Sequence, residues 1–342
     1  MVNEVKKRIF YIDEIRALAI LAVILCHTTS MYSPFIYDFT KLAVPGFLNT
    51  FGLLGVPLFF MISGALLLNR EYTISGFFKK RFNRILYPFV FWMAVTLLIQ
   101  HFVLGANVSQ LTKIFFGLDR YTWFVWVIMG IYLFLPVLNS FVKEFDIKGV
   151  EYFLVIWFVT ITLNTFKLYP FYRLDLSYFA NFIGYFVLGY YLTNKKFNLS
   201  DKKMIILSTL LFIASVIWIY YIKANSLFPS SKYVCLPMVT ASAAVYLLCR
   251  FISSYSDNNS GSLISRIHNR IENGLIGKVI FSISICSYGM YFLNSLIIAL
   301  IKTLDIHYLK MLPVFFIVIA LSSWMIVLLL SKVPFMKKFA GV

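Results

Sequence analysis

Long apolar runs separated by short polar segments repeat along the whole chain. Each run is close to the roughly 20 apolar residues that a helix needs to cross the hydrocarbon core of a bilayer. The pattern therefore predicts an all-α fold, a polytopic membrane bundle of about ten transmembrane helices that forms a single domain over residues 1–342. The predicted spans are 15–33, 47–69, 82–104, 123–142, 151–167, 177–193, 204–222, 233–252, 279–301 and 310–332.

Composition supports a membrane location. Hydrophobic residues make up 61% of the chain and charged residues only 13%, whereas a soluble domain carries about 25% charged residues. A bilayer can solvate that much apolar surface and water cannot. The four cysteines lie in or at the ends of apolar segments, with no spacing typical of a metal site or a disulfide framework.

The charge is strongly basic, with 31 Lys and Arg against 14 Asp and Glu. In a soluble protein this excess would suggest nucleic-acid binding. Here 22 of the 31 basic residues fall in the segments that are internal if the N-terminus is internal. This distribution follows the positive-inside rule, so we expect both termini to be cytoplasmic and no nucleic-acid partner. The expected location is the plasma membrane of a bacterium or archaeon, as a multi-pass protein in contact with membrane lipids.

One titratable side chain lies deep inside the first apolar run. His27 follows Arg16 by eleven residues, which at 100° per residue brings both to within about 20° of the same helix face. Asp13, three residues before Arg16, joins this stripe and can pair with it. At 1.5 Å per residue, about 16 Å separates Arg16 from His27 along the helix axis.

Two functions are open for His27. A buried imidazole can hydrogen-bond to a neighbouring helix and only hold the bundle together. It can also accept and return a proton near neutral pH, which is the work of a general base. Arg16 and Asp13 on the same stripe favour catalysis. The adjacent Cys26 points about 100° away from His27, so we do not expect it to be the nucleophile.

A dense basic cluster begins the third apolar run. Arg81 and Arg84 are spaced i, i+3 and share a face, so their guanidinium groups can hold a phosphate or pyrophosphate. An anchor for anionic lipid headgroups explains the same residues equally well. In the second run, Ser63 and Gly64 form a small pair that allows either close helix packing or the approach of a thin ligand chain.

Polar and aromatic residues also interrupt two later runs. Trp123 opens the fourth run, where aromatic residues form an interfacial belt and can also stack on sugar rings. The ninth run contains Tyr288, Tyr291 and Asn294 in a largely apolar helix. We take these four side chains as candidates for substrate binding.

Together these residues resemble the acyltransferase-3 family of integral membrane O-acyltransferases, over essentially the whole chain. Arg16 followed by His27 is similar to the family's arginine–histidine signature in the first helix. The segment GVPLFFMISG (55–64) resembles the second-helix motif, the Arg81/Arg84 pair the basic pair of the third helix, and WFVWVIMGIYLFLPVL (123–138) the fourth-helix block. Within the family, the chain is most similar to the group that includes the enterobacterial common antigen O-acetyltransferase.

The resemblance implies a function. The donor would be acetyl-CoA or another acyl-CoA on the cytoplasmic side, and the acceptor a hydroxyl of a cell-surface or lipid-linked glycan, with no metal. His27 would act as general base, assisted by Arg16 and Asp13, and both direct transfer and a transient acyl-histidine are open. Arg81 and Arg84 would hold the CoA phosphates. Ser63 and Gly64 would leave room for the pantetheine arm. A group among Tyr288, Tyr291, Asn294 and Ser63 would donate to the developing oxyanion.

Two positions depart from that group's pattern. Thr122 and Asn294 stand where the group tends to have histidines. The first-helix pair is retained, so we expect these changes to affect the acceptor or the acyl group more than the chemistry.

A transporter or flippase of a lipid-linked sugar or small solute is the alternative function. Ten spans and an intramembrane histidine suit it as well. A proton-coupled transporter, however, usually needs a carboxylate or a chain of titratable groups in mid-membrane. The sequence has no mid-span carboxylate and no Gly/Pro-broken helices at matching positions of two halves. Acyl transfer is therefore favoured.

Overall fold

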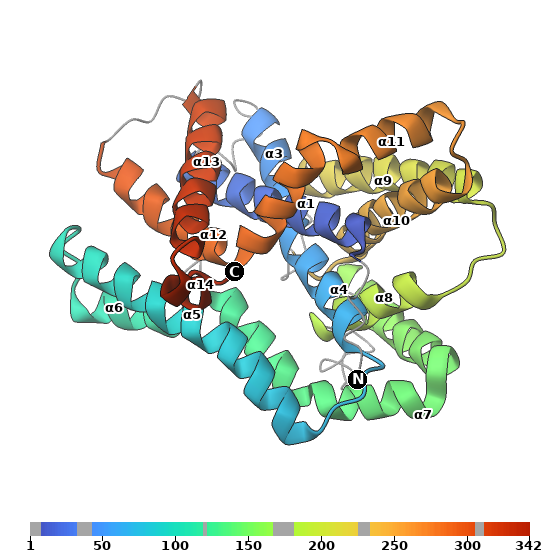
Figure 1. Cartoon of the computed structure of the whole chain (residues 1–342), viewed down its shortest axis with the longest axis horizontal. Coiled ribbons are helices and arrows are strands. Elements are labelled where there is room, and N and C mark those ends of the chain that lie inside the picture. The colour runs from blue at the N-terminus through green and yellow to red at the C-terminus, as the bar shows by residue number, and fades with distance from the viewer. Residues whose placement is uncertain (1–7, 33–42, 119–121, 167–180, 225–232, 305–310) are drawn as a thin grey trace.

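The computed structural model describes residues 8–32, 43–118, 122–166, 181–224, 233–304 and 311–342. Within these ranges the fold is all-helical, as the apolar pattern predicts, and contains no strand (Figure 1). The helices are α1 (Phe10–Thr29), the 3-10 turn η1 (Ser30–Tyr32), α3 (Ala43–Leu53), α4 (Gly55–Leu67), α5 (Ile74–Phe102), α6 (Val108–Phe115), α7 (Trp123–Thr165), α8 (Ile183–Asn194), α9 (Asp201–Ala224), α10 (Leu236–Asn258), α11 (Leu263–Asn273), α12 (Leu275–Lys302), α13 (Leu312–Ser331) and α14 (Pro334–Ala340).

Every predicted span overlaps one of these helices, although residues 33, 167, 177–180 and 310 lie outside the described ranges. In the described part of the chain, seven helical stretches are long and apolar enough to cross a membrane. They are Gly46–Leu67, Ile74–Phe102, Trp123–Thr165, Asp201–Ile222, Leu236–Asn258, Leu275–Lys302 and Leu312–Ser331. α1 falls short because it carries three charged residues in its first two turns, and α8 because it has only 12 residues. The count of ten spans and the cytoplasmic termini stay predictions.

The fourth and fifth predicted spans belong to one bent helix. α7 contains 43 residues and is interrupted at Asp146, where φ is 50° and ψ is −151°. That backbone conformation lies outside the helical region, so the helix changes direction there. Figure 1 shows the two arms of α7 meeting at a sharp corner.

α1 lies at the centre of the bundle. It packs against α3, α4, α10, α12 and α13, and residues on several of its faces, including Ile15, Ile20 and Ile24, are fully buried. Burial on several faces means that α1 does not need a single apolar stripe. The positions of Arg16 and His27 are therefore set by a helix that packs against five others, with Leu18 on its exposed side.

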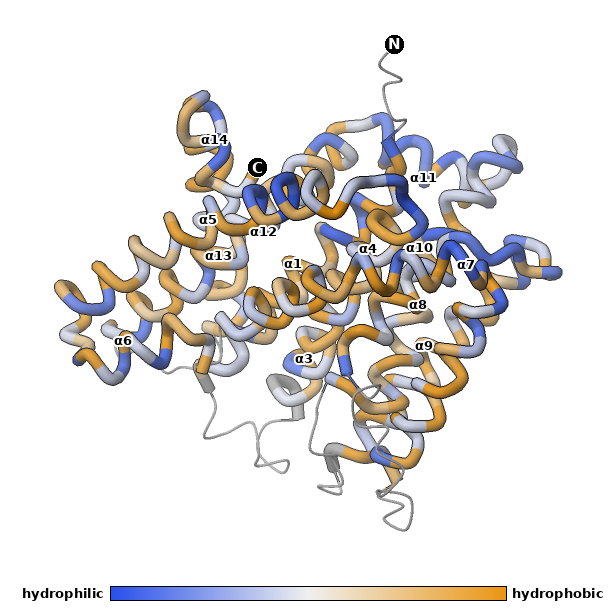
Figure 2. Tube along the Cα trace, turned by 90° about the horizontal axis from the view of Figure 1, so that it is seen from below, coloured by the Kyte–Doolittle hydropathy of each residue, from blue (hydrophilic) through white to orange (hydrophobic). Residues whose placement is uncertain are grey.

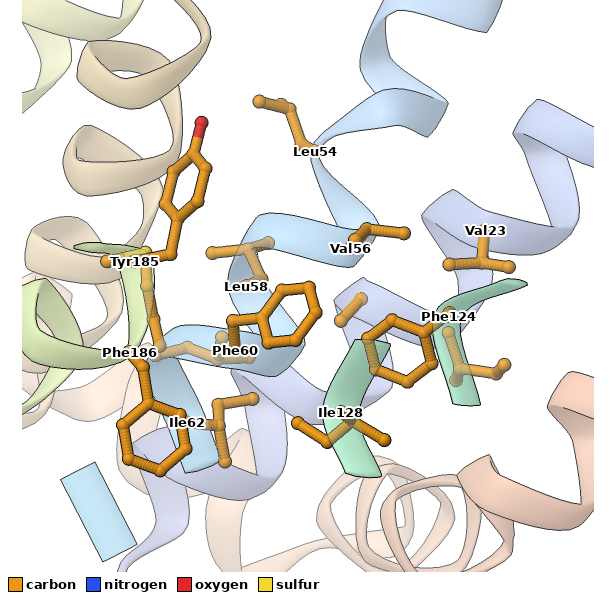
Figure 3. Packing of buried hydrophobic residues seen from close by; sticks show 14 of the residues in the cluster. Val23, Leu54, Val56, Leu58, Phe60, Ile62, Phe124, Ile128, Tyr185 and Phe186 are labelled. Carbon is orange, nitrogen blue, oxygen red and sulfur yellow. The ribbon is translucent and has the colours of Figure 1, made fainter. Parts of the chain in front are cut away.

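α4 and α8 cross with their backbones in close contact. A Cβ atom added at Gly64 would lie 1.7 Å from the Phe186 carbonyl oxygen, and one added at Gly189 would lie 1.9 Å from that of Met61. Only glycine allows such an approach, as in other small-residue helix interfaces. On another face of α4, the ring of Phe60 packs 5.0 Å from that of Phe124 (Figure 3).

α11 lies on the hydrophilic edge of the molecule (Figure 2) and contains a buried histidine, His268. His268 Nδ1 is 4.0 Å from Glu14 Oε1 and its Nε2 is 3.9 Å from Glu272 Oε2, while its ring packs against Phe10. Burial lowers the pKa of His268, and the carboxylates of Glu272 and Asp257 partly oppose that shift.

Candidate active site

His27 of α1 is hydrogen-bonded to Asn294 of α12. Asn294 Oδ1 lies 2.6 Å from His27 Nδ1, and both side chains are buried. The Asn294 amide nitrogen donates to the carbonyl oxygens of Met290 and Tyr291, at 2.9 and 2.6 Å. Because both amide hydrogens are used in this way, the side-chain oxygen must face the histidine. Nδ1 of His27 therefore carries a hydrogen, and the lone pair of the neutral ring is on Nε2.

A very small chamber of about 10 Å³ adjoins His27. That volume is at the lower limit for holding one water molecule. Aromatic rings form much of its wall, and two of them, Trp123 and Tyr233, pack with centroids 5.2 Å apart. The imidazole of His27 is thus closely packed in largely apolar surroundings. The residues lining the chamber are Val23, Cys26, His27, Gly52, Val56, Trp123, Phe124, Tyr233 and Tyr291.

Toward the start of α1, Arg16 belongs to a polar network. Its Nη1 is 3.9 Å from Asp13 Oδ1 and 3.3 Å from Ser284 Oγ. Ser284 in turn donates to Asp13 Oδ1 at 2.7 Å, and Arg8 Nε pairs with Asp13 Oδ2 at 2.6 Å. The predicted pairing of Asp13 with Arg16 is therefore present. Asp13 orients Arg16 and offsets its charge.

A cavity of about 520 Å³ opens beside Arg16, within the range typical of small-molecule sites. Its cationic side chains are Arg16, Arg81, Arg84 and Lys337, and no Asp or Glu side chain is among its described lining residues. Ser63 and Tyr132 also line it. The other lining residues are Phe59, Ile62, Leu66, Leu67, Ile85, Phe124, Ile128, Phe281, Ser284, Ile285, Ser287, Tyr288, Tyr291, Gly341 and Val342, most of them apolar or aromatic. The arrangement suits a ligand with several negative charges and an apolar arm.

Two aromatic rings separate this cavity from His27. Phe124 and Tyr291 line both the cavity and the small chamber, and their ring centroids are 5.5 Å apart. His27 itself lines the chamber only. A ligand in the cavity would therefore contact the rings of Phe124 and Tyr291, and the imidazole of His27 lies on the other side of these rings.

The profile of the acyltransferase-3 family, described as an acyltransferase domain, matches residues 9–331. The match spans α1 through α13, and so includes both ends of the Arg16–His27 stripe. The chain belongs to the acyltransferase-3 family. No curated protein and no solved structure matches it. Its apolar helices and its family together make it a multi-pass membrane acyltransferase, and its assignment to one group within the family stays a prediction.

The acyltransferase brings most of the predicted site residues to these two spaces. Arg16, Arg81, Arg84, Ser63 and Tyr288 line the cavity, Trp123 lines the chamber, and Tyr291 lines both. Asp13 reaches the cavity through Arg16.

Two residues have surroundings that the sequence did not suggest, and for Gly64 the structure favours one of the two explanations that the sequence left open. Asn294, where the sequence departs from the resembled group, touches His27 directly. Thr122, the other departure, donates to the Ile114 carbonyl oxygen at 2.7 Å. Gly64 packs against α8, so helix packing accounts for it, and it is not among the residues that line the cavity.

Several residues of the acyltransferase site were not expected from sequence. Ser284 stands four and seven residues before Tyr288 and Tyr291 on α12, so a helical wheel of that segment would have placed all three on one face. Tyr132 falls on the Phe124 face of α7 for the same reason. Lys337 of α14 had no such signal, because its place depends on how the end of the chain folds back.

Proposed function

We propose that this protein is an O-acyltransferase, specifically an O-acetyltransferase, that moves an acetyl group from acetyl-CoA to a hydroxyl of a cell-surface or lipid-linked glycan. The supporting observation is the pair of spaces on either side of Phe124 and Tyr291. One is lined by cations, and the other holds a buried, oriented imidazole. Such a pair of spaces would let an acyl donor and an acyl acceptor approach one general base from opposite sides.

The donor would occupy the large cavity, which we take to open to the cytoplasm. Arg81 and Arg84 are neighbours on one face of α5, and paired guanidinium groups bind pyrophosphate oxygens bidentately. The pantetheine arm would run along the apolar wall past Ser63, toward Tyr291. Arg16, held by Asp13 and Ser284, would face the donor on its way inward.

His27 would act on the acceptor hydroxyl. Its Nε2 would accept the hydroxyl proton while the acceptor oxygen attacks the thioester carbonyl carbon. Collapse of the tetrahedral intermediate breaks the C–S bond, and the CoA thiolate leaves with the proton returned by the imidazolium. Asn294 would hold the ring and its tautomer through this cycle. Tyr291, which lines both spaces, is the best placed of the candidate groups to donate to the oxyanion.

The acceptor would approach from the Trp123 and Tyr233 side. These rings pack together at the chamber next to His27, and aromatic faces suit the apolar faces of sugar rings. The chamber is too small for a sugar, so we expect the rings to move when the acceptor binds. With the donor in the cytoplasm, this side faces the outside of a bacterial or archaeal plasma membrane.

The test is a transfer assay with the purified full-length protein in nanodiscs. Radiolabelled acetyl-CoA and a glycan extract would be supplied to wild type, His27→Ala and Arg16→Ala. His101→Ala is the matched control, because His101 lies near the end of α5, where it contacts the Ala106 carbonyl and the Phe102 ring and lines neither space. We expect label in the glycan with wild type and control, and a loss of roughly 100-fold or more with His27→Ala. No transfer by wild type, or equal transfer by His27→Ala, would overturn the proposal.

The same preparations distinguish the transporter. A flippase would carry a labelled lipid-linked sugar across a proteoliposome membrane without consuming acetyl-CoA. Movement of that kind in the absence of acyl transfer would replace the enzymatic proposal.

A further inference from the structure

The short helix α14 folds back onto the bundle and is held there by its backbone. Trp92 Nε1 of α5 donates to the Ala340 carbonyl oxygen at 3.5 Å, and Ala340 is fully buried. A Cβ atom at Gly289 of α12 would lie 2.3 Å from the same oxygen, so that position needs glycine. The helix ends at Gly341, whose φ of 84° is the left-handed conformation that terminates helices. α14 is therefore seated between α5 and α12.

Side chains on one face of α14 fix its rotation. Lys338 places its ammonium 3.4 Å from the ring centroid of Tyr87, a cation–π contact. Phe339 packs against the rings of Tyr87 and Phe91, with centroids 5.9 and 6.0 Å away. These contacts turn Lys338 and Phe339 toward α5. Lys337, about 100° round the helix from Lys338, is left to line the large cavity.

Lys337 is the fourth cation of that cavity and comes from a different element than the others. Arg81 and Arg84 lie on α5, Arg16 on α1, and no acidic side chain among the described lining residues offsets them. Like charges gathered at one cavity repel one another unless an anion is present. A set drawn from separate elements suits a ligand whose negative charge is divided between separate groups.

The proposed donor carries its charge in this way. Acyl-CoA has a pyrophosphate between the nucleoside and the pantetheine arm, and a separate phosphate monoester on the 3′ carbon of the ribose. A monoester carries about −1.5 to −2 charges at neutral pH. The Arg81/Arg84 forks match the pyrophosphate, whereas a single flexible ammonium matches a monoester. Lys337 is exposed at the edge of the cavity, where the solvated end of such a donor would lie.

We propose that Lys337 binds the 3′-phosphate of the acyl-CoA donor, so that α14 forms one wall of the donor site. The inference rests on the proposed function for the identity of the donor. It adds a specificity-determining residue that lies six residues after Ser331, where both the last candidate membrane span and the segment matched by the family profile end.

The decisive experiment compares two donors on three proteins. Acetyl-CoA and 3′-dephospho-acetyl-CoA would be given to wild type, Lys337→Gln and Lys338→Gln. Lys338 is the matched control, because it sits on the same helix and faces Tyr87. We expect wild type and Lys338→Gln to show a KM roughly three- to tenfold lower for the donor that has the 3′-phosphate. Lys337→Gln should show the same KM for both donors. A full preference retained by Lys337→Gln would overturn the inference.

A binding arm keeps the inference separate from the chemistry. Adenosine 3′,5′-bisphosphate and 5′-AMP would be titrated calorimetrically into the same three proteins in nanodiscs. Tighter binding of the bisphosphate by wild type and Lys338→Gln, abolished in Lys337→Gln, supports the site even if no acetyl transfer is seen. Absence of that difference in wild type overturns it.

Anionic lipid headgroups share this phosphate chemistry, so the discs would be made with and without phosphatidylglycerol. If Lys337→Gln changes only the dependence on that lipid and keeps the 3′-phosphate preference, Lys337 binds lipid and the inference is wrong. Failure of the proposed function looks different: wild type then transfers no acetyl group from either donor.

Discussion

Asn294 Oδ1 lies 2.6 Å from His27 Nδ1, a contact between residues 267 positions apart. In many hydrolytic sites a carboxylate orients the histidine. An amide fixes the same tautomer without placing a charge in a buried, apolar setting, where an uncompensated charge is costly. The Asn294 amide is itself held by two backbone carbonyls of its own helix. The partner of the proposed base is therefore both neutral and rigid.

Replacing Asn294 by Ala should lower kcat for acetyl transfer by roughly 10- to 100-fold. The physical reason is that the ring of His27 loses its orientation and its preferred tautomer. The KM for acetyl-CoA should stay the same, because the donor cavity is not lined by Asn294. Steady-state kinetics check both numbers. Ser295→Ala is the control, since Ser295 only donates to the Phe292 carbonyl oxygen. Equal kcat values for the two variants would show that Asn294 is not a positioning residue.

Replacing Phe124 by Ala should open the wall between the cavity and His27. Water would then reach the thioester beside the imidazole, so acetyl-CoA hydrolysis without acceptor should rise, by roughly tenfold. A thiol-detecting assay of free CoA measures it. Phe134→Ala removes an exposed ring from the same helix and should leave hydrolysis at the wild-type rate. Unchanged hydrolysis in Phe124→Ala would mean that the ring does not exclude water.

Gly64→Ala should destabilise the fold by about 2–4 kcal/mol, because its Cβ would overlap the Phe186 carbonyl oxygen and force α4 away from α8. A thermal melt of the detergent-purified protein should show a Tm lower by several degrees. Gly130→Ala is the matched control, since nothing lies within 4 Å of a Cβ built there. If both variants have the same Tm as wild type, the close crossing of α4 and α8 does not contribute to stability.

His268 should make the protein less stable in mild acid. Burial lowers the pKa of His268 in the folded state from its usual 6.5, so below that value the unfolded chain takes up the proton more readily and acidification favours unfolding. Between about pH 7.5 and about pH 5.5, the Tm of wild type should fall by about 1–3 °C more than that of His268→Gln. Glu14 and Glu272 are kept in the variant, so the difference between the two proteins reports the His268 proton together with its coupling to these carboxylates. If the Tm of both proteins falls by the same amount, protonation of His268 does not affect stability.

Local geometry explains what could be predicted from sequence. The Arg16–His27 stripe depends only on the period of one helix, and the pairing of Asp13 with Arg16 follows from a spacing of three residues. The apolar runs likewise locate the helices. They do not reveal that two runs continue as one helix bent at Asp146, because the change there is in the backbone angles of a single residue.

Contacts between distant segments explain what could not be predicted. Nothing near His27 in the chain indicates that it will contact Asn294. The helical pattern around Gly64 likewise does not indicate which helix will pack against it. Lys337 and Lys338 look alike in sequence. Only the docking of α14 on α5 makes one a cavity residue and the other a partner of Tyr87.

The central placement of α1 has one more consequence. Arg16 and His27 belong to one unbroken helix that packs against five others, so the roughly 16 Å of helical rise between them is fixed. This fixed distance sets the length that a donor must have to reach from Arg16 to His27. A thioester on a full pantetheine arm spans it with its phosphates still among the arginines, whereas a truncated thioester or a small acyl phosphate does not. The acyltransferase would thus select its donor by length, without needing to recognise the acyl group itself.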